Sequence, residues 1–128
     1  MLLYEVSPRF CETDAMGHIN NTVLPVWFES ARGAIFEICN PGLSLDKWNL
    51  ILRKIDVDFL AQTYYEFPAQ VRTRIGHIGQ SSFVVEHELW QRGEKTATGS
   101  AVMIYFDYNA QQKQEIPAAI RTELQKLS

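Results

Sequence analysis

The sequence contains few cysteines and no cluster of metal-binding residues. Only Cys11 and Cys39 occur among the 128 residues, and neither belongs to a CxxC pair or to the Cys/His grouping of a zinc site. A chain of this length can bury a real core and needs no disulfide to fold. We therefore expect two reduced thiols and no metal. Cys11 is expected to be a small buried residue, because a nucleophilic thiol needs a base within hydrogen-bond reach.

Long apolar runs and an excess of positive charge are also missing. No stretch approaches the ~20 apolar residues of a membrane span, and residues 1–5 lack the basic region and cleavage pattern of a signal peptide. The 12 Lys and Arg against 15 Asp and Glu give a net charge of −3, which argues against the basic surface that binds nucleic acid. We predict a single globular domain spanning residues 1–128, located in the cytoplasm, without a membrane span or a nucleic-acid partner.

Residues 22–38 show the spacing of a long helix. Apolar residues recur there at intervals of three and four, at Leu24, Phe28, Ala31, Ile35 and Ile38. Asn20, Asn21 or Thr22 can cap its first amides, Pro25 suits a first turn, and the Asn-Pro-Gly at 40–42 marks its end. Further apolar residues on the other side, Val26 and Phe36, indicate burial around more than half of the helix.

The remaining elements have the character of strands. Residues 69–75 and 83–89 alternate between apolar and polar side chains, segments 51–59 and 96–106 predict two further strands, and residues 2–10 an edge strand. Pro117 opens a short helix with Ile120, Leu124 and Leu127 on one face. Gly99 would let its strand approach the long helix closely. The predicted class is α+β, with a five-stranded antiparallel sheet wrapped around one long central helix and a short C-terminal helix.

One stretch carries a specific motif. Residues 9–21 read Arg-Phe-Cys-Glu-Thr-Asp-Ala-Met-Gly-His-Ile-Asn-Asn, and residues 28–32 read Phe-Glu-Ser-Ala-Arg. Together they resemble the signature of the 4-hydroxybenzoyl-CoA thioesterase family of the hotdog superfamily, and segments 78–82 and 98–107 resemble its later landmarks. The resemblance implies a hotdog fold, an acyl-CoA thioesterase without a dissociable cofactor, and a homodimer or homotetramer whose site forms between subunits.

The motif also suits the chemistry of thioester hydrolysis. This reaction needs a base or an attacking carboxylate, and donors for the oxyanion that forms. Asp14 can serve as general base or as nucleophile, and the free amides at a helix N-terminus favour negative charge. By the resemblance, the backbone N–H of Asn21 polarises the thioester carbonyl opposite Asp14.

Other residues of the motif receive supporting roles. Gly17 would allow the tight turn between the two groups, and His18 or Asn20 could orient water or the carbonyl. Ser81 and Ser82 are candidate residues of the pantetheine channel. The family often has an aromatic residue where this chain has Leu24, which indicates either a pocket for an aliphatic acyl group or simple repacking.

Several residues have a plainer interpretation. Taken alone, Asp14 would be an Asx-turn residue that binds its own backbone, and His18 a surface histidine. Ser81 and Ser82 could be turn residues. Arg72 and Arg74 could bind the phosphates of coenzyme A or simply form a solvated strand face. His87 is expected to be a satisfied core or interface histidine, not a catalytic one.

Two other functions compete with a thioesterase. A non-catalytic module that binds acyl-CoA or acyl carrier protein could use the same fold, since fold alone does not fix chemistry. A hotdog hydratase would carry a catalytic histidine in a distinct helix motif, which is missing here. The acyl group and the choice between coenzyme A and acyl carrier protein stay open.

Overall fold

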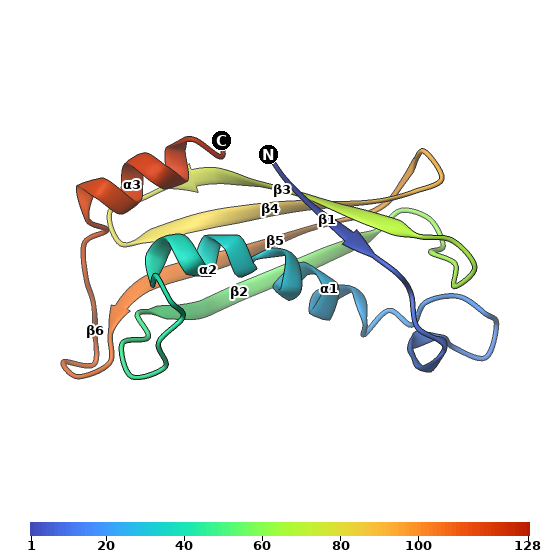
Figure 1. Ribbon diagram of the computed structural model, residues 1–128, viewed down its shortest axis with the longest axis horizontal. Coiled ribbons are helices and arrows are strands. Elements are labelled where there is room, and N and C mark those ends of the chain that lie inside the picture. Colours follow the sequence, from blue (N-terminus) through green and yellow to red (C-terminus); the bar gives the residue numbers. More distant parts are fainter.

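The computed structural model describes all residues, 1–128 (Figure 1). Strand β1 (Leu2–Val6) is followed by the single 3-10 turn η1 (Phe10–Glu12), helices α1 (Leu24–Ala31) and α2 (Gly33–Cys39), and strand β2 (Leu50–Phe59). Strands β3 (Ala69–Ile78), β4 (Ser82–Gln91), β5 (Glu94–Asp107) and β6 (Gln112–Lys113) come next, and helix α3 (Ala118–Gln125) ends the chain. The α+β class is confirmed.

The strands form one antiparallel sheet in the order β1-β3-β4-β5-β2, with β6 added to β5. The predicted alternation holds best in β4, where every second side chain from Phe83 to Gln91 is buried. The short β6, which pairs Phe106 and Asp107 with residues 113 and 112, was not expected and makes the sheet six-stranded. Helices α1 and α2 lie end to end across one face of the sheet, and α3 lies at one end beside β3 (Figure 1).

The prediction of one long central helix is wrong, because the helix breaks at Arg32. Its backbone N–H is shared between the carbonyls of Phe28 and Glu29, at 3.2 and 3.0 Å, which tightens the last turn of α1. Gly33, which begins α2, is a poor helix former. The apolar stripe nevertheless continues across the break, since Phe28 and Ala31 before it and Ile35 after it are all buried.

Burial of the helix is narrower than the sequence indicated. Val26 is 56% exposed, so one side of α1 is open, whereas Phe36 is partly buried against the core. The core itself consists of two clusters, one around α1 and β1 and one around α2 and α3. Leu124 of α3 is fully buried in the second cluster, and Ile120 and Leu127, the latter just after the helix, pack against that cluster.

Gly99 marks the closest approach between helix and sheet. A Cβ atom at this position would lie 2.6 Å from Cε2 of Phe28, which is closer than side chains can pack. The missing side chain therefore lets β5 touch α1, as the sequence indicated.

The two cysteines are free and lie in different surroundings. Cys39 is buried, and this burial raises the pKa of its thiol to about 12. Cys11 is exposed, so the prediction of a buried residue is wrong. The reason is local, because only Glu12 of the three residues in η1 turns into the protein.

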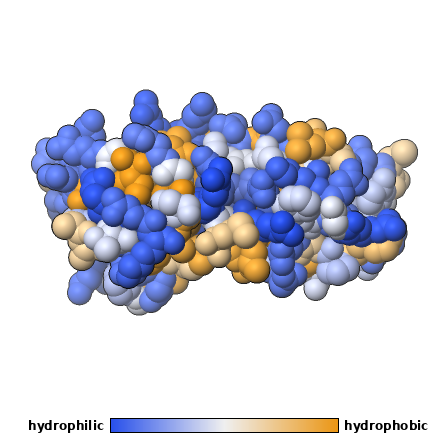
Figure 2. Space-filling model, turned by 90° about the horizontal axis from the view of Figure 1, so that it is seen from above, coloured by the Kyte–Doolittle hydropathy of each residue, from blue (hydrophilic) through white to orange (hydrophobic).

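The surface of the molecule is uneven in polarity. Seen from above β3 and α3, hydrophilic residues dominate and hydrophobic ones form separate patches (Figure 2). Strand β2, at the edge of the sheet, is different: Ile51, Leu52, Ile55 and Phe59 are between 38% and 54% exposed there. No helix in the structure has both the length and the apolar character needed to span a membrane.

Candidate active site

The motif identified in the sequence forms a loop between η1 and α1, which its own backbone holds closed. The N–H of Asp14 donates to the carbonyl of His18 at 2.7 Å, and the N–H of Asn20 donates to the carbonyl of Glu12 at 2.8 Å. Gly17 has a φ of +78°, in the left-handed region that favours glycine. The tight turn expected at this residue is therefore present.

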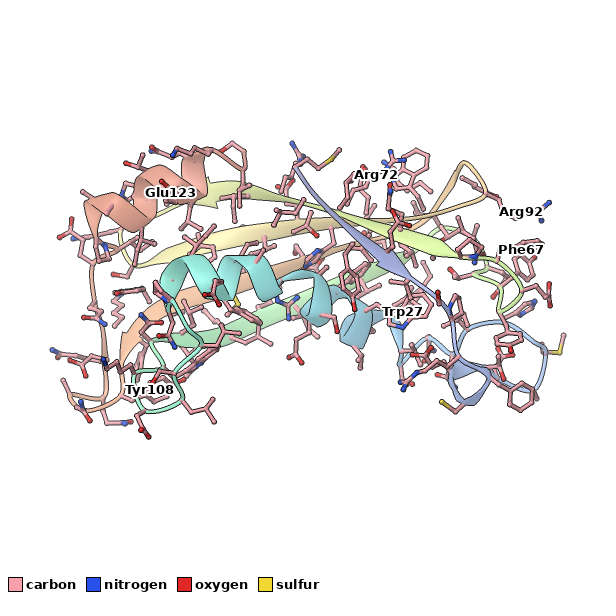
Figure 3. The ribbon with its side chains drawn as sticks, viewed as in Figure 1. Trp27, Phe67, Arg72, Arg92, Tyr108 and Glu123 are labelled. Atoms are coloured by element: carbon pink, nitrogen blue, oxygen red, sulfur yellow. The ribbon has the colours of Figure 1, made fainter.

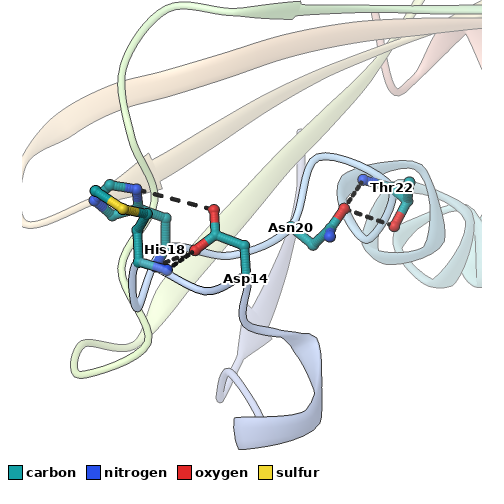
Figure 4. Close-up of polar contacts among 5 residues, drawn as sticks. Asp14, His18, Asn20 and Thr22 are labelled. Atoms are coloured by element: carbon teal, nitrogen blue, oxygen red, sulfur yellow. Dashed lines mark hydrogen bonds and ion pairs between the residues drawn. The ribbon is translucent and has the colours of Figure 1, made fainter.

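The two carboxylate oxygens of Asp14 have different surroundings (Figure 4). Oδ1 accepts the N–H groups of Met16 at 2.7 Å and His18 at 3.1 Å, which is the Asx-turn pattern. Oδ2 accepts no hydrogen bond from the chain and lies 4.0 Å from Nδ1 of His18. The side chain is 36% exposed. One oxygen thus holds the loop, while the other is free to meet water or a ligand.

The next turn prepares the start of α1. Oδ1 of Asn20 accepts the N–H of Thr22 at 3.0 Å and its hydroxyl at 2.9 Å (Figure 4), and the carbonyl of Asn20 accepts the N–H of Val23 at 3.0 Å. The N-cap residue of α1 is Val23 and no side chain caps the helix, so the prediction that Asn20, Asn21 or Thr22 caps it is wrong; Asn20 instead holds the turn that precedes the helix. The N–H of Asn21 donates to no group of the chain. A free donor therefore stands at the entrance to the helix.

Asp14, Asn20 and Asn21 line one pocket of about 570 Å³. Its apolar wall includes Ile19 and Leu24, so Leu24 lies where the sequence placed it, in contact with the pocket and with the core. The remaining wall comes from the end of β2 and the segment after it, residues 59–63. Gly17 and His18 shape the loop but do not line the pocket.

Ser81 and Ser82 lie elsewhere. Ser81 ends the turn between β3 and β4, and Ser82 is the first residue of β4. In this turn the guanidinium of Arg121 in α3 donates to the carbonyl of Gly79 at 3.0 Å. This turn is at the α3 end of the sheet, whereas the Asp14 loop is at the other end (Figure 1). Within one chain the structure does not bring these serines to the pocket.

Sequence reasoning missed the buried carboxylate of Glu12. It accepts the backbone N–H of Arg9 at 2.7 Å and, at 2.9 Å, the indole N–H of Trp27, which Figure 3 labels, and so ties the start of the loop to α1. Burial works to raise the pKa of Glu12, but these hydrogen bonds and the charge of Arg9 together hold it below its usual value. Its place two residues before Asp14 was the available signal.

The segment 59–63 was also missed, and no local signal could have revealed it. Its residues look like an ordinary connection between strands, and they lie some distance along the chain from the motif. Yet the carbonyl of Thr63 accepts the N–H of Ile19 at 2.8 Å, and its hydroxyl donates to Thr96 at 2.9 Å. The pocket therefore depends on a long-range contact.

His87 is a satisfied core histidine, as expected. Arg32 can only donate, so Nε2 of His87 accepts from its guanidinium at 3.3 Å, and Nδ1 carries the proton toward the hydroxyl of Thr73 at 2.8 Å. The ring stacks on Phe28 with centroids 4.8 Å apart. Burial, assisted by the charge of Arg32, lowers the pKa of His87 to about 3.

This shift predicts loss of stability in acid. Below the ordinary pKa of 6.5, His87 is protonated in the unfolded chain, whereas in the native protein it stays neutral down to about pH 3. The free energy of unfolding should therefore fall as the pH drops through this window, by at most ~1.4 kcal/mol per pH unit for this group. Urea unfolding between pH 7 and pH 4, compared with a His87→Gln variant that cannot titrate, measures it. Identical pH profiles for the two proteins would contradict the prediction.

The two arginines of β3 favour the plainer interpretation. Arg74 pairs with Glu86 at 2.6 Å, while Arg72 donates to Gln70 at 2.8 Å and lies 4.2 Å from the ring centroid of Trp90. Neither lines the pocket. Both behave as residues of a solvated strand face.

Comparison with known proteins decides the family. The model of the thioesterase-like superfamily matches residues 8–124. The chain belongs to this superfamily. A predicted thioesterase from Bacillus stearothermophilus superposes with a TM-score of 0.96 at 36% identity, covering 98% of this chain and 95% of that one. The resemblance seen in the sequence, to a hotdog-fold thioesterase family, is confirmed.

Two further relatives of this superfamily member are informative. A thioesterase from Thermus thermophilus, solved with coenzyme A and Zn, has a TM-score of 0.87 at 28% identity, over 98% of this chain and 92% of that one. The uncharacterized protein YsmA of Bacillus subtilis (strain 168) is 29% identical over 102 residues, which are 78% of this chain and 69% of YsmA. The superfamily match and the likeness to the two thioesterases support a hydrolase.

Proposed function

We propose that the protein is an acyl-CoA thioesterase, which hydrolyses an acyl-coenzyme A thioester to the free acid and coenzyme A. One observation supports the proposal: Asp14, whose Oδ2 accepts no hydrogen bond from the chain, and Asn21, whose N–H has no partner in the chain, line the same pocket. Thioester hydrolysis requires such a pair, a carboxylate and an oxyanion donor. The coenzyme A bound to the Thermus thermophilus thioesterase supports coenzyme A as the carrier.

The proposed chemistry places the thioester carbonyl against the N–H of Asn21. Asp14 then acts in one of two ways. As a base it takes a proton from water, whose oxygen attacks the carbonyl carbon; as a nucleophile it attacks directly, and water hydrolyses the resulting anhydride. Either route passes through an oxyanion that the N–H stabilises, expels the thiolate of coenzyme A, and needs no dissociable cofactor.

The neighbouring residues have supporting roles in this proposal. His18, whose Nδ1 lies 4.0 Å from Oδ2 of Asp14, could orient the attacking water. Asn20 fixes the turn that presents the N–H of Asn21, and Gly17 provides the bend between the two groups. Ser81 and Ser82 could line the pantetheine channel only of a neighbouring subunit, because they lie far from the pocket of their own chain.

A hydrolysis screen tests the function directly. The protein is incubated with short-chain, long-chain and aromatic acyl-CoA thioesters, and release of the free thiol is followed with a thiol reagent. We expect turnover of at least one class. Binding of acyl-CoA without hydrolysis of any would contradict the proposal and leave the non-catalytic binding module.

The protein is also expected to form a homodimer or homotetramer. Strand β2 is an unpaired edge with exposed apolar side chains, a surface that natural sheets pair or cover. Light scattering should give a mass near a multiple of 14.7 kDa. Ile55→Glu on β2 should weaken assembly, and Leu45→Glu, at an 85% exposed loop position, should not. A monomer that stays fully active on dilution would contradict this prediction.

A further inference from the structure

Gln91 is a buried polar residue whose side chain forms hydrogen bonds with a loop and not with its own strand. It is the last residue of β4 and only 4% exposed. Its carboxamide oxygen accepts the N–H of Tyr64 at 2.7 Å, while its nitrogen donates to the carbonyls of Tyr64 at 2.8 Å and Phe67 at 3.0 Å. The backbone N–H can only donate and the carbonyls can only accept, so the orientation of the amide is fixed. The side chain thus pairs with Tyr64 as a neighbouring strand would.

The loop held by Gln91, residues 60–68, has little other support. It connects β2 to β3 without a helix or strand of its own. Beyond Gln91, the hydroxyl of Thr63 bonds to Thr96, and the carbonyl of Thr96 accepts the N–H groups at 60 and 61. At its far end, Phe67 lies 4.1 Å beneath the guanidinium of Arg92 (Figure 3). Within residues 64–67 the N–H of Tyr65 also donates to the carbonyl of Gly17, at 3.5 Å, and the three bonds to the Gln91 amide are shorter.

This loop in turn supports the candidate site. The carbonyl of Thr63 accepts the N–H of Ile19, and Tyr64 forms an isolated antiparallel bridge with His18. The rings of His18 and Tyr64 meet edge to face with centroids 5.3 Å apart. His18 donates its N–H to Asp14. A continuous chain of contacts thus runs from Gln91 through Tyr64 and His18 to the carboxylate.

We propose that Gln91 is a positioning residue of the active site, which acts through the Tyr64 backbone to hold the Asp14 loop against its pocket. The role rests on the proposed function, because it serves the geometry of Asp14 and Asn21. An apolar side chain at position 91 leaves three partly buried backbone groups, the N–H and carbonyl of Tyr64 and the carbonyl of Phe67, without their partner. The loop must then move to regain hydrogen bonds, and His18 and Asp14 move with it. Displacements of about 1 Å at a reacting group are enough to reduce turnover by ~10²-fold.

The test uses two substitutions at position 91 and one matched control. Gln91→Met removes all three bonds at similar volume. Gln91→Glu keeps the shape and the acceptor for Tyr64 but sets a carboxylate oxygen against two carbonyls. Asn40→Leu is the control, because Asn40 is also buried and its amide also donates to a loop carbonyl, that of Ser44 at 2.8 Å, far from the pocket. All three proteins are assayed well below their melting temperatures.

Both variants at position 91 should lower kcat at least about tenfold, and Asn40→Leu should keep kcat within about twofold of the wild type at a comparable loss of melting temperature. Hydrogen exchange gives a readout without substrate: the amide of Ile19 should exchange faster in Gln91→Met and not in Asn40→Leu. If the wild type hydrolyses no thioester, the proposed function is wrong. The positioning role is then tested by hydrogen exchange at the amide of Ile19 alone. Unchanged kcat or unchanged exchange at Ile19 in Gln91→Met would overturn it.

Discussion

Asp14→Asn is expected to reduce thioester hydrolysis by at least about a thousandfold while leaving the fold intact. Asparagine keeps an oxygen for the N–H groups of Met16 and His18, so the Asx-turn can persist. It places an amide where Oδ2 stands, and an amide is neither a base nor a competent nucleophile. At ~1.4 kcal/mol per tenfold in rate, such a loss corresponds to about 4 kcal/mol of barrier. Steady-state kinetics measures it, with circular dichroism and the melting temperature as checks of folding.

The chain offers a closely matched control for this substitution. Oδ1 of Asp107 accepts the N–H groups of Asn109 at 2.9 Å and Ala110 at 3.1 Å, the same kind of turn at a site outside the pocket. Asp107→Asn should therefore have the same small effect on stability and none on turnover. Wild-type turnover in a folded Asp14→Asn protein would refute the assignment of Asp14.

The two interpretations of Asp14 illustrate what a sequence can and cannot resolve. A Thr-Asp pair before a glycine predicts an Asx-turn, and the motif around it predicts chemistry; both predictions concern the same carboxylate. In the structure each oxygen fits one of the two predictions: Oδ1 accepts backbone N–H groups, as in an Asx-turn, and Oδ2 accepts no hydrogen bond from the chain. A sequence pattern predicts the role of a whole residue, and it cannot predict that two oxygen atoms of one side chain have different surroundings.

The fold was predictable where a local period decides it. Strands 69–75 and 83–89 follow from strict alternation, and the helical stripe from intervals of three and four. The break at Arg32 was not predictable from the stripe, because Ile35 keeps the spacing set by Phe28 and Ala31. The interruption has a different origin, in Gly33 and the tightened turn before it.

The candidate site was predictable only on its local side. Asp14, Asn20 and Asn21 lie close along the chain, and the structure brings all three to the pocket. Residues 59–63 and Gln91 reach the same region through antiparallel pairing and side-chain contacts over long sequence separations. The sequence around these residues contains no pattern that would predict which distant residues they contact. Long-range placement of this kind has to come from the structure.

Asn21→Pro is expected to damage turnover far more than Asn21→Ala. The backbone N–H of Asn21 has no partner in the chain, and its exposed side chain makes no hydrogen bond that alanine would lose. Alanine keeps the N–H and should keep most of the rate. Proline removes it, and loss of one oxyanion donor typically costs ~10²–10³ in turnover.

Proline at position 21 also restricts the preceding residue, so the comparison needs a control for the turn. Asn20 holds that turn by accepting the N–H and the hydroxyl of Thr22. Thr22→Ala removes the hydroxyl alone, and it shows how strongly a loosened turn affects the rate. Circular dichroism and light scattering must first show that each variant keeps its fold and assembly. If Asn21→Ala is as damaging as Asn21→Pro in folded proteins, the acting group is the side chain of Asn21, and the backbone donor is wrong. If Asn21→Pro is severe while Asn21→Ala and Thr22→Ala are mild, the result supports the backbone N–H of Asn21 as the donor that binds the oxyanion.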